Sequence, residues 1–238
     1  HQLYIEQSGN PNGIPVLYLH GGPGGGCSKN HRRYFDPSRY RIILFDQRGC
    51  GRSQPSPSIA NNSLEELLAD IEYIRQHLTI SQWLLAGGSW GTTLALAYGI
   101  KHADKVFGFI LRGIFLGSQA EYNWLYKKEG VAKIYPEYYR QFIGHLTEKE
   151  QIDPLSAYYQ KLTSDNEVAV ISASKSWCLW ELQLSTLEHH NIGMARIDDP
   201  HQALCMAKIS SHFFINQCFL TENYILDNIQ QIEKIPAI

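Results

Sequence analysis

The sequence predicts an α/β fold in which a mostly parallel sheet is wound by helices and carries a helical insertion. Up to residue 116, short apolar runs bounded by turn residues alternate with stretches of helical period, the pattern of a sheet built by crossover connections. Beyond that point the composition changes: 15 of the 19 glycines lie before residue 117, whereas eight of the 14 tyrosines lie after it. We therefore expect a core over 1–116, a helical cap over 117–231 and the start of a returning core strand over 232–238.

Five apolar runs predict the strands of the core. The first two are joined by the turn formers Gly-Asn-Pro-Asn-Gly, which predicts that they form a β-hairpin. The last three are short, bulky and apolar, as expected for strands that are buried on both faces. In order, the predicted strands are 2–7, 16–20, 41–45, 83–86 and 106–111.

Helical spacing places two helices between the later strands. Apolar residues recur at this spacing from Leu64 to Leu78, and Ser63 and Glu66 have the spacing of a capping box. A second helix is expected over 91–102, before the last strand. The insertion consists of helical segments with breaks near three prolines, which are Pro136, Pro154 and Pro200.

Charge and hydropathy exclude two classes of partner. The chain has 238 residues, of which 44% are hydrophobic, with 21 Lys and Arg against 23 Asp and Glu, so it lacks the basic excess of a nucleic-acid-binding protein. Its longest nearly apolar run, 106–116, contains Arg112 and is much shorter than the roughly 20 residues that cross a bilayer. We expect no nucleic-acid or membrane partner, and the sequence does not reveal the oligomeric state.

The cysteines indicate a reducing compartment. They are odd in number and form no Cys-x-x-Cys pair, so we expect free thiols in a cytoplasmic protein rather than a disulfide framework or a zinc site. Cys27, which follows a glycine-rich loop, is expected to be inert. The five positions are 27, 50, 178, 205 and 218.

A serine motif predicts the chemistry. Residues 87–91 read Gly-Gly-Ser-Trp-Gly and fit G-x-S-x-G, in which a sharp turn from strand to helix exposes the serine hydroxyl. The pattern occurs by chance in roughly one chain in ten of this length, but here an apolar strand precedes it and a helix-compatible stretch follows. We expect Ser89 to be a nucleophile; the alternative is a glycine-rich turn with an incidental serine.

A glycine-rich loop follows the second predicted strand, where residues 20–26 read HGGPGGG. Glycines let backbone amides approach a ligand closely, so this loop could supply one N–H group to an oxyanion while the amide of Trp90 supplies the other. A phosphate-binding loop is disfavoured because neither Gly-Lys-Ser/Thr nor Gly-x-Gly-x-x-Gly is present.

Four motifs in order resemble the signatures of the proline iminopeptidases, also called prolyl aminopeptidases. They are HGGPGGG, DQRGCGRS at 46–53, GGSWG, and LRGIF at 111–115. The resemblance runs from Tyr4 to the last residues and is most specific in the first 116. It implies an α/β-hydrolase core with an inserted helical cap, no cofactor, and a serine peptidase that releases N-terminal proline from short peptides.

The same resemblance implies roles for individual residues. Ser89 would be the nucleophile, and Trp90 and Gly22 would supply the oxyanion amides. Glu181 matches the cap carboxylate that holds the amino group of the substrate. The positions that would face the substrate pocket are Arg112, Phe115, Tyr126 and Phe214. The alternatives are a solvated charge for Glu181 and a place in the cap's own core for the aromatic residues.

The sequence departs from the family pattern at two points. Residues 208–216 read KISSHFFIN where the family resembles R-I-E-x-H-Y-F-x-N, so Ser210 replaces an acidic residue of the amine site. The acid and histidine of the triad are expected after the cap, and none of the ten histidines occupies such a position. We therefore expect the C-terminal part of the core to be missing, with both residues beyond Ile238. The adjacent His189 and His190 make a poor metal pair, and no metal site is expected.

These departures leave two other functions open. Loss of one carboxylate makes an esterase or amidase with a different acyl preference plausible. Loss of the base would leave a non-catalytic ligand-binding relative that keeps the serine turn.

Overall fold

The computed structural model describes residues 1–185 and 198–238, and His189 and His190 lie outside these ranges. Within them, five strands form one mixed sheet in the order β1-β3-β2-β4-β5, and all neighbouring pairs are parallel except β1 and β3. The predicted α/β class is confirmed. The strands are β1 Tyr4–Gly9, β2 Ile14–Leu19, β3 Tyr40–Asp46, β4 Trp83–Ser89 and β5 Val106–Ile114.

The predicted hairpin of the first two strands is wrong. β1 pairs antiparallel with β3, with Tyr4 opposite Asp46, and does not pair with β2. β2 lies between β3 and β4 and is parallel to both. Both edges of β2 are paired, one with β3 and one with β4. The chain that leaves β1 therefore passes β3 to reach the place of β2 in the sheet.

The two core helices lie where helical spacing predicted them: α1 is Leu64–His77 and α2 is Trp90–Lys101. The predicted capping box is not formed, because the Ser63 side chain makes no capping hydrogen bond. The Glu66 carboxylate lies instead 3.5 Å from the Arg48 guanidinium, which is itself held by Asp70 at 2.6 Å. A tertiary ion pair has replaced the local contact.

The last strand is not buried on both faces, contrary to the prediction. Phe107, Ile110 and Ile114 of β5 are exposed. The reason is the position of β5 at the end of the strand order. Along its outer edge, the Phe109 N–H donates to Pro236 O at 2.9 Å, and Ile238 continues this pairing in parallel.

The described part of the inserted segment is mainly helical, and α4, α5 and α8 each begin at one of the predicted break prolines. Proline suits a first helical position because its missing N–H would have no partner there. The helices are α3 Gln119–Tyr126, α4 Pro136–Ile143, α5 Pro154–Leu162, α6 Glu167–Ser185, α8 Pro200–Ile215 and α9 Tyr224–Asp227. Short 3₁₀ turns are Lys29–Tyr34, Ala103–Lys105, Val131–Lys133, Glu150–Ile152, Gln217–Phe219 and Ile229–Gln231.

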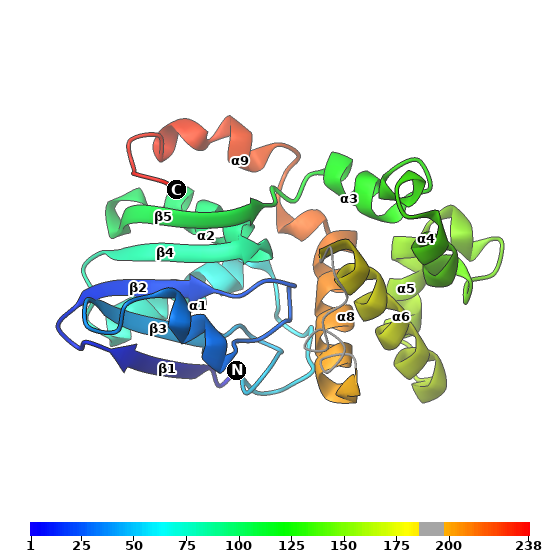
Figure 1. Cartoon of the computed structure of the whole chain (residues 1–238), viewed down its shortest axis with the longest axis horizontal. Helices are drawn as coiled ribbons and strands as arrows, with labels where there is room; N and C mark the ends of the chain where they lie inside the picture. Colours follow the sequence, from blue (N-terminus) through cyan, green and yellow to red (C-terminus); the bar gives the residue numbers. More distant parts are fainter. Residues whose placement is uncertain (186–197) are drawn as a thin grey trace.

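Helices α3 to α6 and α8 gather at one end of the strands, and α8 lies nearest the sheet (Figure 1). Helix α9 lies instead beyond β5 and packs against α2 (Figure 1). The division into 1–116, 117–231 and 232–238 remains a prediction, and the position of α9 favours an earlier return to the core. Among the described helices, none has the length and apolar character needed to cross a membrane.

Candidate active site

Ser89 stands at the junction of β4 and α2. Its backbone has φ 54° and ψ −126°, a conformation that costs a non-glycine residue roughly 1–3 kcal/mol. The residue is exposed, and its hydroxyl makes no hydrogen bond to another described side chain. The strained turn thus presents the hydroxyl to solvent at the end of the sheet, as the serine motif predicts.

Residue 91 must be glycine because the serine turn lies directly against the backbone of β2. A Cβ atom on Gly91 would lie 2.1 Å from the backbone oxygen of Leu19, which cannot move without displacing the strand. A Cβ atom on Gly88 would meet only the flexible Arg112 side chain, at 3.0 Å. Two of the three glycines in residues 87–91, Gly88 and Gly91, therefore differ in how much they tolerate substitution.

We expect Gly91→Ala to lower the free energy of unfolding by about 3 kcal/mol through overpacking. Gly88→Ala is the matched control in the same turn and should cost about 1 kcal/mol or less. Urea denaturation of both variants measures the difference. Equal stability of the two would show that the turn does not approach β2 as closely as described.

The glycine-rich loop lies against Ser89. A Cβ atom on Gly21 would lie 3.7 Å from the Cβ atom of Ser89. On its other side the loop contacts α8, because a Cβ atom on Gly24 would lie 3.0 Å from that of Ile209. Gly22, between them, has φ +122°, which favours glycine. The loop therefore passes between the serine and the cap.

Trp90 is the first residue of α2, so its backbone N–H has no partner within the helix and is available to an anion. Its side chain is fully buried. The indole ring packs 4.9 Å from the ring of Phe213 on α8, and its Nε1–H donates to Gln47 Oε1 at 2.9 Å. The amide predicted to hold an oxyanion therefore belongs to a firmly anchored residue.

Phe115 and Phe214 connect the core to the cap. Thr92 on α2 holds the Phe115 backbone, whose N–H donates to Thr92 Oγ1 at 3.0 Å. The Phe115 ring lies edge-to-face with Phe214 of α8 at 5.7 Å, and Phe214 lies 5.9 Å from Tyr126 of α3. Three of the aromatic residues singled out from the sequence are therefore brought together, but each is largely buried.

Glu181 of α6 joins this group. Its carboxylate accepts a hydrogen bond from the Tyr126 hydroxyl. Burial raises the pKa of Glu181 to about 6, and the hydrogen bond from Tyr126 opposes this rise. A partly enclosed carboxylate beside aromatic rings is suited to hold a small cation, because the positive charge of an ammonium group would stabilise the negative charge of the carboxylate.

Ser210 of α8 contributes no charge to this group. It is fully buried, and its hydroxyl donates to the Met206 carbonyl one turn earlier at 2.5 Å. This back-bond satisfies the hydroxyl within its own helix. At this position the helix therefore has no group available to a cation, and Glu181 is left as the carboxylate of the predicted amine site.

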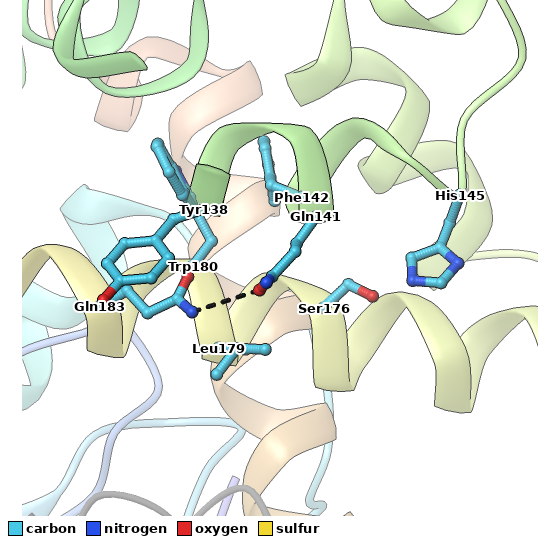
Figure 2. Close-up of a pocket in the computed structure, with 8 residues that line it drawn as sticks. All are labelled: Tyr138, Gln141, Phe142, His145, Ser176, Leu179, Trp180 and Gln183. Atoms are coloured by element: carbon cyan, nitrogen blue, oxygen red, sulfur yellow. Dashed lines mark hydrogen bonds between the residues drawn. The ribbon is translucent and has the colours of Figure 1, made fainter. Parts of the chain in front are cut away.

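The cavities in the described part of the cap include one beside Tyr126 and one between α4 and α6. One, of about 160 Å³, is lined by Tyr126 and Phe214 together with residues of α3 and α5. The other, of about 250 Å³, lies between α4 and α6, where Gln183 Nε2 donates to Gln141 Oε1 at 3.4 Å (Figure 2). Ser89 lines neither of them.

Known proteins resemble the chain in sequence and structure. A family model described as the alpha/beta hydrolase fold matches residues 14–196. A proline iminopeptidase of Xylella fastidiosa is 44% identical over 239 residues, which cover the whole chain and 76% of that protein. The chain belongs to the proline iminopeptidase family. Another member, from Arabidopsis thaliana, is 44% identical over 237 residues, covering 99% of the chain and 62% of the relative.

Solved structures agree on the fold. The crystal structure of proline iminopeptidase from Mycobacterium smegmatis aligns with a TM-score of 0.58 at 15% identity, covering 99% of this chain and 76% of that one. DBJA aligns with a TM-score of 0.57 at 17% identity, with the same coverage of each chain. Epoxide hydrolases from hot-environment metagenomes align with a TM-score of 0.55 at 16% identity, covering 89% of this chain and 65% of that chain.

In this member of the proline iminopeptidase family, Arg112 lies beside the serine turn. β5 pairs it with Gly88 of β4, and the residue is exposed. It is therefore near Ser89. Its predicted role in substrate binding remains a prediction.

His20 and Gln47 of this family member lie in the HGGPGGG and DQRGCGRS motifs, and no sequence pattern predicted a role for either. Both are buried. The Gln47 N–H donates to His20 Nε2 at 3.0 Å, so this nitrogen carries no proton, and His20 Nδ1 lies 3.0 Å from the Gly21 carbonyl oxygen. Within 1–185 and 198–238, no three His, Cys, Asp or Glu side chains are grouped to hold a metal ion.

All five cysteines lie in described segments and are unpaired thiols. Cys27, next to the glycine loop, has its pKa raised by burial and by the negative charge of Asp46. Such a thiol is protonated at neutral pH and is a poor nucleophile. Near the loop, Ser89 rather than Cys27 is therefore the candidate nucleophile of this family member.

Proposed function

We propose that the chain is a serine exopeptidase that releases N-terminal proline from short peptides through an acyl-enzyme at Ser89. The observation that carries the proposal is the exposed Ser89 hydroxyl on a strained turn, beside a glycine loop and at the N-terminus of α2. The substrate class comes from relatives that are named proline iminopeptidases. Hydrolysis of a chromogenic proline amide by the full-length gene product tests it.

In the proposed reaction, Ser89 Oγ attacks the carbonyl carbon of the proline residue. The amides of Trp90 and Gly22 donate to the oxyanion, the peptide amine leaves with a proton, and water then hydrolyses the ester. A histidine base paired with a carboxylate must move these protons. The alignment covers 76% of the Xylella protein, so part of that relative has no counterpart in residues 1–238. We propose that the region corresponding to this part supplies both the histidine and the carboxylate.

Glu181 is the proposed partner of the substrate's secondary ammonium group. Its carboxylate is joined to Tyr126, whose ring, with that of Phe214, offers an apolar wall for a pyrrolidine ring. Arg112 and Phe115 are proposed to face the same substrate from the core. Binding of the charged amine explains how an exopeptidase would distinguish a free N-terminus from an internal peptide bond.

The raised pKa of Glu181 predicts a pH effect on substrate selection. Glu181 is negatively charged above pH 6 and neutral below it, because its pKa is about 6. The proline ammonium remains protonated throughout this range. We therefore expect kcat/KM for free-amine substrates to fall as the pH is lowered through about 6, as measured from initial rates at low substrate concentration.

A histidine base has an ordinary pKa of about 6.5, so the comparison requires Glu181→Gln. The ratio of kcat/KM between wild type and Glu181→Gln cancels the titration of the base. We expect this ratio to fall as the pH decreases. A ratio that does not change with pH would show that the Glu181 carboxylate does not contact the amine.

A second candidate function is an esterase or amidase with a different acyl preference. Ser210 favours it, because the amine site has one carboxylate where the family pattern has two acidic residues. Comparison of free-amine with N-acylated substrates separates the candidates, since only the peptidase should reject the blocked compounds. For either candidate we propose a cytoplasmic location, which the five unpaired thiols support.

A further inference from the structure

One buried side chain joins the two parts of the proposed oxyanion site. Gln47, directly after β3, accepts a hydrogen bond at Oε1 from the Trp90 indole, at 2.9 Å. Its Nε2 donates to the carbonyl oxygen of His20 at 2.9 Å, immediately before the glycine loop. All three residues are at most 2% exposed. The partners also settle the amide orientation, because the indole N–H only donates and the carbonyl only accepts.

The residue before Gln47 holds the other end of the same loop. The Cys27 N–H donates to Asp46 Oδ1 at 2.6 Å. Asp46 Oδ2 accepts from the Arg52 backbone N–H at 2.9 Å and from Arg52 Nε at 2.7 Å. Burial raises the pKa of Asp46, but these hydrogen bonds outweigh it and the pKa is lowered, so the carboxylate stays charged.

We propose that Gln47 is a positioning residue for the oxyanion site, setting the spacing between the glycine loop and the amide of Trp90. The inference rests on the proposed function and deepens it. A loop of glycines has almost no side chains with which to fix its own conformation, so its position must come from outside. The Gln47 amide fixes the start of the loop through the His20 carbonyl and fixes Trp90 through its indole N–H. Asp46 fixes the end of the loop through the Cys27 N–H.

The chemistry of the amide explains why glutamine suits this position. The site requires one donor and one acceptor on the same side chain. A carboxylate would place a second acceptor against the His20 carbonyl. An apolar side chain would remove one hydrogen bond from the buried His20 carbonyl and one from the buried Trp90 indole. A neutral carboxylic acid, by contrast, could donate to His20 and accept from Trp90.

Gln47→Met in the full-length gene product tests the proposal. We expect kcat for a proline amide to fall about 10- to 100-fold, with KM within about threefold of wild type, because a displaced donor weakens the transition state more than the ground state. Tyr98→Phe is the matched control. It removes a 2.8 Å hydrogen bond to Glu72 near the far end of α2 and should leave kcat unchanged. Unchanged kcat in Gln47→Met overturns the proposal, as does a rise in KM alone.

Gln47→Glu provides a second readout if the methionine variant does not fold. Burial raises the pKa of a carboxyl group, so the introduced acid is neutral at low pH and ionised at high pH. Its kcat relative to wild type should therefore fall as the pH rises from about 5 to about 9. A purely structural role predicts no such trend, and a constant ratio overturns the proposal.

Ser89→Ala separates failure of this inference from failure of the proposed function. Activity that survives Ser89→Ala refutes the serine mechanism, and the role of Gln47 falls with it. Activity that is lost in Ser89→Ala but kept in both Gln47 variants refutes only the positioning role.

Discussion

Replacement of Ser89 by alanine should lower kcat for a chromogenic proline amide by at least about 10⁴-fold. The hydroxyl is the atom that forms the proposed acyl-enzyme, and the structure leaves it exposed on a strained turn. The substitution removes one oxygen atom and no hydrogen bond to a described side chain, so stability should change little. Initial rates of the full-length gene product and its variant measure the effect.

Ser81→Ala is the matched control for this substitution, because Ser81 is also exposed and lies just before the other end of β4. It should retain wild-type activity. A fluorophosphonate should label wild type and Ser81→Ala but not Ser89→Ala. Absence of labelling in wild type would favour the non-catalytic ligand-binding alternative, and labelling of Ser89→Ala would contradict the assigned nucleophile.

Replacement of Glu181 by glutamine should reduce kcat/KM for free-amine substrates by about 100-fold. Loss of one partner from an enclosed ion pair costs about 3 kcal/mol, which corresponds to this factor. The neutral amide keeps the shape and can still accept from the Tyr126 hydroxyl, so the cap should remain folded. N-acylated substrates lack the ammonium, and their slow hydrolysis should be unaffected.

Glu148→Gln controls for the loss of a negative charge on the cap, because Glu148 is exposed between α4 and α5. It should leave both substrate classes unchanged. If Glu181→Gln weakened hydrolysis of free-amine and N-acylated substrates equally, the carboxylate would have a structural role and no contact with the amine.

Local patterns predicted those features that depend on neighbouring residues. The serine turn was recognisable because its geometry requires small residues within two positions of Ser89, and Gly91 is indeed pressed against β2. The first residues of α4, α5 and α8 were recognisable because proline favours that position. Alternation of apolar runs with helical spacing predicted the parallel sheet and its crossovers.

Features that depend on distant residues were predicted poorly. A turn sequence after β1 could not show that β3 would pair with β1, because strand order depends on packing of the whole sheet. The capping box at Ser63 failed because Glu66 faces Arg48 from another part of the chain. The apolar runs of β5 looked like those of β4, yet their burial differs because the two strands occupy different places in the sheet.

The fold class, the family and the position of the serine turn could be predicted before the structure, because each follows from residues close together in the chain. The hydrogen bond between Tyr126 and Glu181, and those that join Gln47 to His20 and Trp90, became evident from the folded chain. Gln47 is 27 residues from one partner and 43 from the other. Contacts over such separations arise from how the strands and the cap pack, and no local pattern encodes them.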